Sequence, residues 1–167
     1  MLTKSDIRAE IRTRRREMPA TGPGSVAELS SEICSRIEAM PEFRAAGTIL
    51  SYTPMRGEVD VSLLDCSGKK VILADCDWQD IPADEIEFAI IPGVAFAPLT
   101  PDSGEVSDQG MQAVLQNCMR LGRGGGYYDR LMPLLHCRTV APAFPFQIYD
   151  SVPADPWDRP VDIVIIP

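Results

Sequence analysis

The sequence predicts a single α/β domain whose mostly parallel β-sheet carries helices on both faces, a Rossmann-like three-layer arrangement. Short, almost wholly apolar runs at 70–74 and 87–91 are typical of strands that are buried on both faces of a parallel sheet. Segments with helical apolar spacing alternate with these runs, which is the pattern of α/β proteins. The length of 167 residues suits one hydrophobic core. We therefore expect residues 1–167 to form one domain.

Two helices are expected before the first strand. Thr3 and Asp6 have the spacing of a capping box, and Ser25 and Glu28 repeat it. The second helix should end at Pro41 because the residue before a proline disfavours helical geometry. The apolar positions that define the buried faces are Ile7, Ile11 and Met18 in the first helix and Val26, Leu29, Ile33, Ile37 and Met40 in the second.

The rest of the chain alternates strands with less regular segments. We expect five strands, at 48–52, 70–74, 87–91, 138–144 and 162–166. A helix over 127–135 is predicted by the apolar spacing of Tyr128, Leu131 and Leu135. Residues 75–86 form a short acidic link. Residues 97–119 form a long connection with a possible short helix around 111–119, and connections of this length are usually functional or mobile.

Composition excludes several kinds of site. His136 is the single histidine, so a Ser-His-Asp hydrolase would have to use it and a histidine-rich metal centre is impossible. Its apolar neighbours favour a structural role. The five cysteines form no C-x-x-C pair, which favours reduced thiols over a disulfide framework or a zinc site. No apolar run approaches the ~18 residues of a membrane span, and the first 17 residues do not resemble a leader, so we expect a cytoplasmic protein.

Charge is distributed unevenly along the chain. The formal net charge is −8, yet residues 1–16 hold six basic and two acidic residues. The rest of the chain is acidic, which argues against nucleic acid or a membrane as a partner. The local group of basic residues suits a compact anionic ligand. Lys4, Arg8 and Arg12 lie at i, i+4 and i+8 on one helix face and could bind phosphate or carboxylate oxygens. The alternative is a solvated helix face, which we expect for residues 14–16.

A glycine-rich segment, RLGRGGGYYDR, occupies residues 120–130. Its glycines allow a ligand to approach the main chain closely, and a glycine-rich loop before a helix is typical of phosphate sites. Arg120 and Arg123 add positive charge, and Asp129 could hold Mg²⁺ beside phosphates. The spacing matches neither the P-loop nor the dinucleotide fingerprint. A purely structural turn is the alternative.

This segment resembles the signature of the 5-formyltetrahydrofolate cyclo-ligase family, also called methenyltetrahydrofolate synthetases. Weaker similarities to the family follow in the same order along the chain, at Lys4 and Arg8, at 51–60, at 91–96, at 143–147 and at 152–162. Together these blocks extend from near residue 4 to the end of the sequence.

The resemblance implies a ligase of one-carbon metabolism that converts 5-formyltetrahydrofolate into 5,10-methenyltetrahydrofolate, with release of ADP and phosphate. ATP would transfer its γ-phosphoryl group to the formyl oxygen, and N10 would then attack the activated carbon. Such chemistry requires positioning and charge neutralisation more than a histidine nucleophile. The implied ligands are ATP, Mg²⁺ and a reduced folate, and we expect a monomer that binds neither nucleic acid nor membranes.

The resemblance also implies roles for individual residues. Arg123 and Tyr127 would be catalytic, and Asp129 and Asp158 would bind Mg²⁺. Substrate would contact Thr53, Glu58, Arg123 and Tyr127. The residues implied to bind ATP are Lys4, Arg8, Arg120, Gly122, Arg123, Gly124, Gly125, Gly126, Tyr127 and Tyr128.

Two segments depart from the family pattern. The interval 75–86 is shorter than its counterpart, which helps to wall the folate pocket, and 97–119 is an atypical insertion. The insertion could rebuild that wall or act as a mobile lid. Two other functions stay open: a non-catalytic nucleotide- or folate-binding homologue, and an ATP-dependent enzyme that acts on another small amide or carboxylate.

Overall fold

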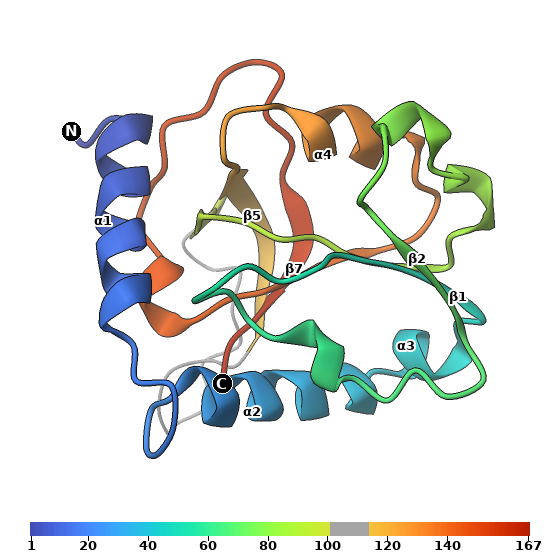
Figure 1. The fold of residues 1–167 in the computed structure, drawn as a ribbon. Helices are drawn as coiled ribbons and strands as arrows, with labels where there is room; N and C mark the ends of the chain where they lie inside the picture. The colour runs from blue at the N-terminus through green and yellow to red at the C-terminus, as the bar shows by residue number, and fades with distance from the viewer. Residues whose placement is uncertain (101–113) are drawn as a thin grey trace.

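The computed structural model describes residues 1–100 and 114–167, and these form a twisted seven-stranded sheet between helices (Figure 1). The strand order is β2-β1-β3-β6-β7-β5-β4. The first five strands in this order run parallel, whereas β5 is antiparallel to β7 and β4 is antiparallel to β5. The bounds are β1 Thr48–Ser51, β2 Lys70–Leu73, β3 Phe88–Ile90, β4 Ala95–Pro98, β5 Val114–Leu121, β6 Thr139–Pro142 and β7 Val161–Ile165.

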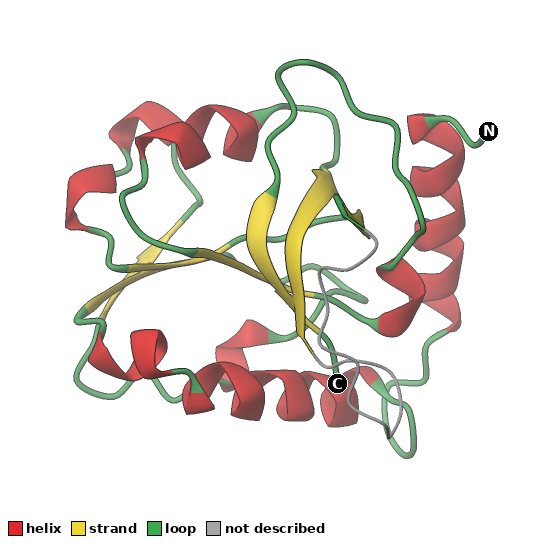
Figure 2. Cartoon of the chain, turned by 180° about the vertical axis from the view of Figure 1, so that it is seen from behind, coloured by secondary structure: helices red, strands yellow, loops and turns green. Residues whose placement is uncertain are grey.

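Helices cover both faces of this sheet, as predicted (Figure 2). Helices α2 (Val26–Ala39) and α3 (Pro41–Ala45) lie on one face. The opposite face carries α4 (Tyr127–Leu131) and the short 3-10 helices η2 (Trp78–Asp80) and η3 (Ala83–Glu85). Helix α1 (Lys4–Glu17) packs against β4 and the 3-10 helix η5 (Pro145–Gln147). In the described part of the chain, no helix is both long and apolar enough to cross a membrane.

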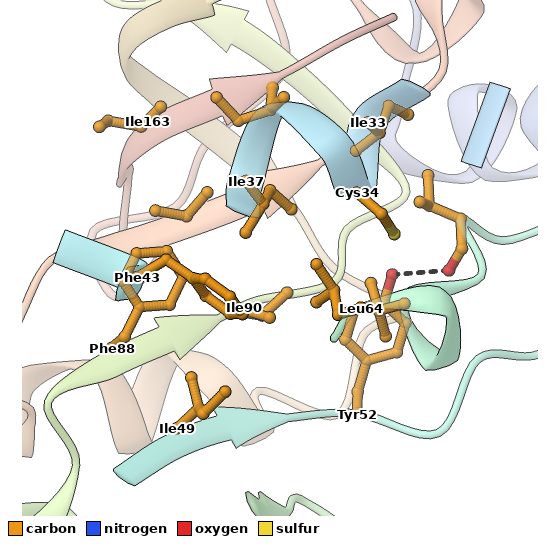
Figure 3. Close-up of a cluster of buried hydrophobic side chains, with 14 of the residues drawn as sticks. Ile33, Cys34, Ile37, Phe43, Ile49, Tyr52, Leu64, Phe88, Ile90 and Ile163 are labelled. Carbon is orange, nitrogen blue, oxygen red and sulfur yellow. Dashed lines mark hydrogen bonds between the residues drawn. The ribbon is translucent and has the colours of Figure 1, made fainter. Parts of the chain in front are cut away.

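Alternation along the strands divides the core into two layers. Ile49 of β1 faces α2 and α3, while its neighbour Leu50 faces the opposite layer. In the first layer Phe43 and Phe88 meet edge to face at 5.4 Å, and Ile33 and Ile37 of α2 pack over the sheet (Figure 3). The run at 87–91 was therefore interpreted correctly, because β3 is buried throughout. The run at 70–74 also forms a strand, but β2 lies at the edge of the sheet and exposes Val71 and Leu73, so the expected burial on both faces was wrong there.

The capping predictions are also confirmed. The Thr3 side chain accepts a hydrogen bond from the Asp6 amide, and the Asp6 side chain accepts one from the Thr3 amide. The Ser25 side chain caps α2 by accepting a hydrogen bond from the amide of Glu28. The Glu28 side chain accepts from the amide of Gly24 instead of Ser25, so the second capping box is only half formed. Helix α2 ends at Ala39, two residues before Pro41. Each cap satisfies backbone donors that no helical carbonyl can reach.

Two local predictions were wrong. The helix expected around 111–119 is instead strand β5 from Val114 onward, because hydrogen bonds to β7 on one side and β4 on the other fix an extended backbone. The helix expected over 127–135 ends as α4 at Leu131 and continues as a 3-10 turn, Met132–Leu134, where Pro133 lacks an amide donor. The remainder of the proposed 97–119 insertion, residues 101–113, lies outside the described residues.

Candidate functional site

A cavity of about 300 Å³ lies where the chain leaves β1, β2 and β3 and meets the glycine-rich segment. Ligand sites of α/β proteins commonly lie beyond the carboxyl ends of parallel strands. Ten of the residues predicted to bind ligands line this cavity. They are Thr53, Glu58, Arg120, Gly122, Arg123, Gly125, Gly126, Tyr127, Tyr128 and Asp129.

The glycine-rich loop needs its glycines for conformation and for space. Gly124 and Gly126 have φ values of +115° and +70°, which residues with a Cβ rarely adopt. A Cβ on Gly122 would lie 2.9 Å from Nη1 of Arg120. Helix α1 docks on this loop, since Arg8 donates from Nε to the carbonyl of Gly122 over 2.9 Å. The two cationic segments of the sequence therefore meet in the fold.

Lys4 joins the N-terminal helix to the loop before β7. Its ammonium group pairs with Asp155 at 2.6 Å and also with Asp158. Burial would raise the pKa of Asp158, but hydrogen bonds from the Asp155 amide and from Lys4 outweigh burial and lower it. Asp158 is therefore a carboxylate in this position, and one of its oxygens is engaged by Lys4.

Asp129 is held by a buried arginine. Arg120 donates to Oδ1 of Asp129 over 3.2 Å and to the carbonyl of Pro92 over 3.1 Å. The amide of Arg159 also donates to Oδ1 of Asp129, at 3.0 Å, so the backbone next to Asp158 touches Asp129. The Arg120 guanidinium thus forms part of the cavity wall.

Asp129 and Asp158 are the two carboxylates that were predicted to bind Mg²⁺, and each keeps one oxygen without a hydrogen bond in the described structure. Within the described residues, Oδ2 of Asp129 and Oδ1 of Asp158 accept no hydrogen bond. Magnesium bound with a nucleotide typically takes one or two protein carboxylates together with phosphate oxygens. A cluster of three or more metal-binding side chains is absent from the described residues, so phosphate and water would have to complete the coordination.

Glu58 is the most constrained acidic residue of the cavity. Its side chain is 4% exposed and pairs through Oε1 with Arg123 and, at 3.4 Å, with Arg15. Its Oε2 accepts a hydrogen bond from the amide of Met55 over 2.9 Å. Arg123 is 55% exposed, so it can leave Glu58 without opening the core. The glycine-rich loop and the predicted substrate carboxylate are therefore in direct contact.

Arg15 corrects the expectation that residues 14–16 are solvated. Its side chain is 15% exposed, and Nη2 donates to the carbonyl of Gly93 over 3.0 Å. Burial lowers the pKa of Arg15, and the carboxylate of Glu58 opposes that effect. The sequence held a signal for this position, because Arg15 continues the four-residue spacing of Ile7 and Ile11, the buried residues of α1.

The tyrosines of the cavity are neutral hydrogen-bonding groups. Burial raises the pKa of Tyr52, Tyr127 and Tyr128 above the usual tyrosine range. The hydroxyl of Tyr52 donates to the carbonyl of Val59 (Figure 3). The hydroxyl of Tyr127 is buried without a partner in the described structure. An unpaired buried hydroxyl is costly, so Tyr127 is available to a ligand.

Other predicted residues lie beside the cavity or away from it. Lys4, Arg8, Gly124 and Asp158 are not part of its lining; Gly124 lies against the Arg8 guanidinium, 3.6 Å from the position of an added Cβ. His136 is exposed, lies 3.2 Å from Asp84 and is not part of the cavity lining. The structure therefore provides no role for histidine in this site.

Comparisons with known proteins agree with this picture. Residues 109–167 match the model of the 5-formyltetrahydrofolate cyclo-ligase family. None of the curated proteins matches the sequence. The solved structure of Aquifex aeolicus 5,10-methenyltetrahydrofolate synthetase is 25% identical, with a TM-score of 0.73 over 98% of this chain and 89% of the other. The solved structure of Mycoplasma pneumoniae 5,10-methenyltetrahydrofolate synthetase is 22% identical, with a TM-score of 0.72 over 99% of this chain and 99% of the other, and it shares the fold. The resemblance of this chain to the 5-formyltetrahydrofolate cyclo-ligase family is therefore confirmed, by the family model over residues 109–167 and by a fold shared along nearly the whole chain.

Proposed function

We propose that this protein is an ATP- and Mg²⁺-dependent cyclo-ligase that converts 5-formyltetrahydrofolate into 5,10-methenyltetrahydrofolate. The observation that carries the proposal is the contact between Arg123 and Glu58, because it places the glycine-rich loop beside the carboxylate implied to bind the folate ring. The match to the family model and the Aquifex aeolicus synthetase support the same activity.

The proposed reaction has two steps. The formyl oxygen attacks the γ-phosphorus of ATP, a P–O bond forms, and the bond to ADP breaks. N10 then attacks the formyl carbon and loses its proton, while the C–O bond to phosphate breaks. Both steps concentrate negative charge on phosphate oxygens, so fixed cations lower the barrier.

Each group of residues has a task in this scheme. Arg8 and the loop from Gly122 to Gly126 would bind the phosphates, and Arg123 would leave Glu58 to neutralise the transferred group. Glu58 would then accept two hydrogen bonds from the amino and ring N–H groups of the pterin. The free hydroxyl of Tyr127 would donate to the formyl group. Asp129 and Asp158 would hold Mg²⁺, which supplies charge neutralisation at phosphate oxygens.

The direct test mixes the full chain with MgATP and 5-formyltetrahydrofolate and follows the absorbance of the methenyl product after an acid quench. We expect the product and ADP to form in equal amounts. ADP without the methenyl product would contradict the proposal in favour of another acceptor. Tight binding of ATP or folate without ADP formation would contradict it in favour of a non-catalytic binding protein.

A further inference from the structure

The proposed ring closure requires a group that accepts a proton. N10 carries a hydrogen when it attacks the formyl carbon, and the nitrogen is positively charged until that proton leaves. Only then can the lone pair of N10 expel the phosphate and complete the methenyl bridge. The acceptor has to lie within hydrogen-bond distance of the proton, and carboxylates and histidines are the usual choices. Because His136 is not part of the cavity lining, a carboxylate is the better candidate.

Three carboxylates belong to the described lining of the candidate cavity, on Glu58, Asp75 and Asp129. Those of Glu58 and Asp129 already accept hydrogen bonds from arginine side chains and from backbone amides. The proposed function also assigns Glu58 to the pterin and Asp129 to Mg²⁺. Asp75 differs from both, because it makes no hydrogen bond or ion pair within residues 1–100 and 114–167. Both of its oxygens are therefore available to a substrate.

The backbone holds Asp75 at the mouth of this cavity. It follows Ala74, whose amide donates to the carbonyl of Ser51 over 2.9 Å, so the ends of β1 and β2 are joined just before Asp75. Helix η2 begins three positions later and packs against α4 (Figure 1). Asp75 is exposed, so a proton bound there can pass directly to water.

Asp75 also lies near the hydroxyl that the proposed function assigns to the formyl group. Asp75 and Tyr127 line the same cavity. The pKa of Tyr127 is raised by burial first and then by its neighbours Cys76, Asp77 and Asp75, which places the start of the 75–86 link close to this hydroxyl. The formyl carbon and N10 become neighbours in one ring on closure, so a group beside the formyl group is also near N10.

We infer that Asp75 is the general base of ring closure, an inference that rests on the proposed function. After the bond between N10 and the formyl carbon forms, the Asp75 carboxylate takes the proton from N10. The electron pair left on N10 then expels phosphate as the C–O bond breaks, and Asp75 releases its proton to water. A positioned general base typically accelerates such a step about 10²- to 10⁴-fold.

Rapid kinetics with the full chain separate the two chemical steps. We would mix the chain with MgATP and 5-formyltetrahydrofolate, follow the methenyl absorbance by stopped flow at neutral pH, and measure ADP in quenched samples. In Asp75→Asn, the first turnover should give ADP at the wild-type rate and methenyl product about a hundredfold more slowly. Ring closure at the wild-type rate, or an equal loss of both products, would overturn the inference.

Binding and rescue distinguish a proton acceptor from a residue that only binds substrate. Calorimetry without ATP should give the same affinity for 5-formyltetrahydrofolate in Asp75→Asn and in the wild type. In Asp75→Ala, added formate should restore part of the rate of ring closure, because a small carboxylate can replace the missing one, whereas chloride at equal ionic strength should not. Weaker folate binding in Asp75→Asn, or no rescue by formate, would overturn the inference.

Asp77→Asn is the matched control. Asp77 is exposed and lies in the same link, but it caps η2 through the amide of Gln79 and is not part of the cavity lining. This variant should keep both rates, and a loss of ring closure equal to that of Asp75→Asn would overturn the inference.

The wild-type chain separates this inference from the proposed function. If the wild type forms neither ADP nor methenyl product, the proposed function fails, and the inference fails with it. If the wild type forms both and Asp75→Asn closes the ring equally fast, the inference alone fails.

Discussion

Nη1 of Arg15 lies 3.4 Å from Oε1 of Glu58, which joins the last turn of α1 to the loop after β1. The same guanidinium donates to the carbonyl of Gly93, beyond β3. Arg15 therefore holds the Glu58 carboxylate in place through its own ion pair, independently of Arg123. When Arg123 turns toward a ligand, Glu58 keeps one cationic partner and its hydrogen bond from Met55.

Replacing Arg15 should weaken both the fold and substrate binding. In Arg15→Met, the buried Glu58 loses a partner and the Gly93 carbonyl loses a donor, so we expect unfolding to cost about 1–3 kcal/mol less than in the wild type. KM for the folate should rise more than kcat falls. Urea denaturation and steady-state kinetics measure the two effects. Arg14→Met is the matched control, because Arg14 is 53% exposed and, among the described residues, pairs with Glu10 alone. Similar changes in both variants would contradict the role of Arg15.

Arg123 should matter most for the chemical step. Its removal deletes an arginine that lines the candidate cavity and contacts Glu58, so Arg123→Ala should lower kcat about a hundredfold or more. Rates of methenyl product formation test this, with Arg14→Ala as the control that retains activity. If the two variants lost activity equally, Arg123 would have no special part in turnover.

Two glycines with nearly the same positive φ angle separate the cost of backbone strain from the cost of a steric clash. Gly57 has φ +77°, and a Cβ there would lie 2.7 Å from Cβ of Arg15; Gly68 has φ +76° with nothing within 4 Å of the same position. Gly68→Ala should therefore cost roughly 1 kcal/mol from the left-handed backbone alone. Gly57→Ala should cost more, because the loop must move away from α1. Denaturation of both variants measures the difference, and equal losses would show that the loop does not depend on this close contact.

Thiol reactivity should follow burial. Burial raises the pKa of Cys34 to about 12 and that of Cys118 to about 11, so thiolate is scarce at these positions until the pH nears those values. Cys76 is exposed. Iodoacetamide at pH 8, read by peptide mass spectrometry, should label Cys76 first and reach Cys34 and Cys118 only after denaturant is added. Uniform labelling of the native chain would contradict the described core.

The success of the sequence predictions depended on how local the determining interactions are. The caps at Thr3 and Ser25 and the apolar run around Ile90 are local, and all were predicted correctly. Strand β5 was missed because Leu115 and Met119, four residues apart, fit one helix face as well as alternate positions of a strand. Only its pairing with β7 and β4 decides between the two.

In the candidate site, too, local features could be predicted from the sequence and long-range contacts could not. The family resemblance identified Glu58 and Arg123 separately, but nothing in their spacing predicted that the two side chains touch. Arg15 was missed because its partner is 43 positions away. Its place on the stripe of Ile7 and Ile11 indicated burial, and a buried arginine needs a carboxylate or carbonyl partner. The long-range pairing itself follows only from the fold.

The central claim is that ATP activates the formyl oxygen before the ring closes. The most direct measurement supplies the full chain with MgATP and 5-formyltetrahydrofolate labelled with ¹⁸O in the formyl group, and determines the isotope content of the released phosphate. The account predicts one ¹⁸O atom in each phosphate, with ADP and methenyl product in equal amounts. Unlabelled phosphate, or labelled folate recovered unchanged from folded protein, would contradict it.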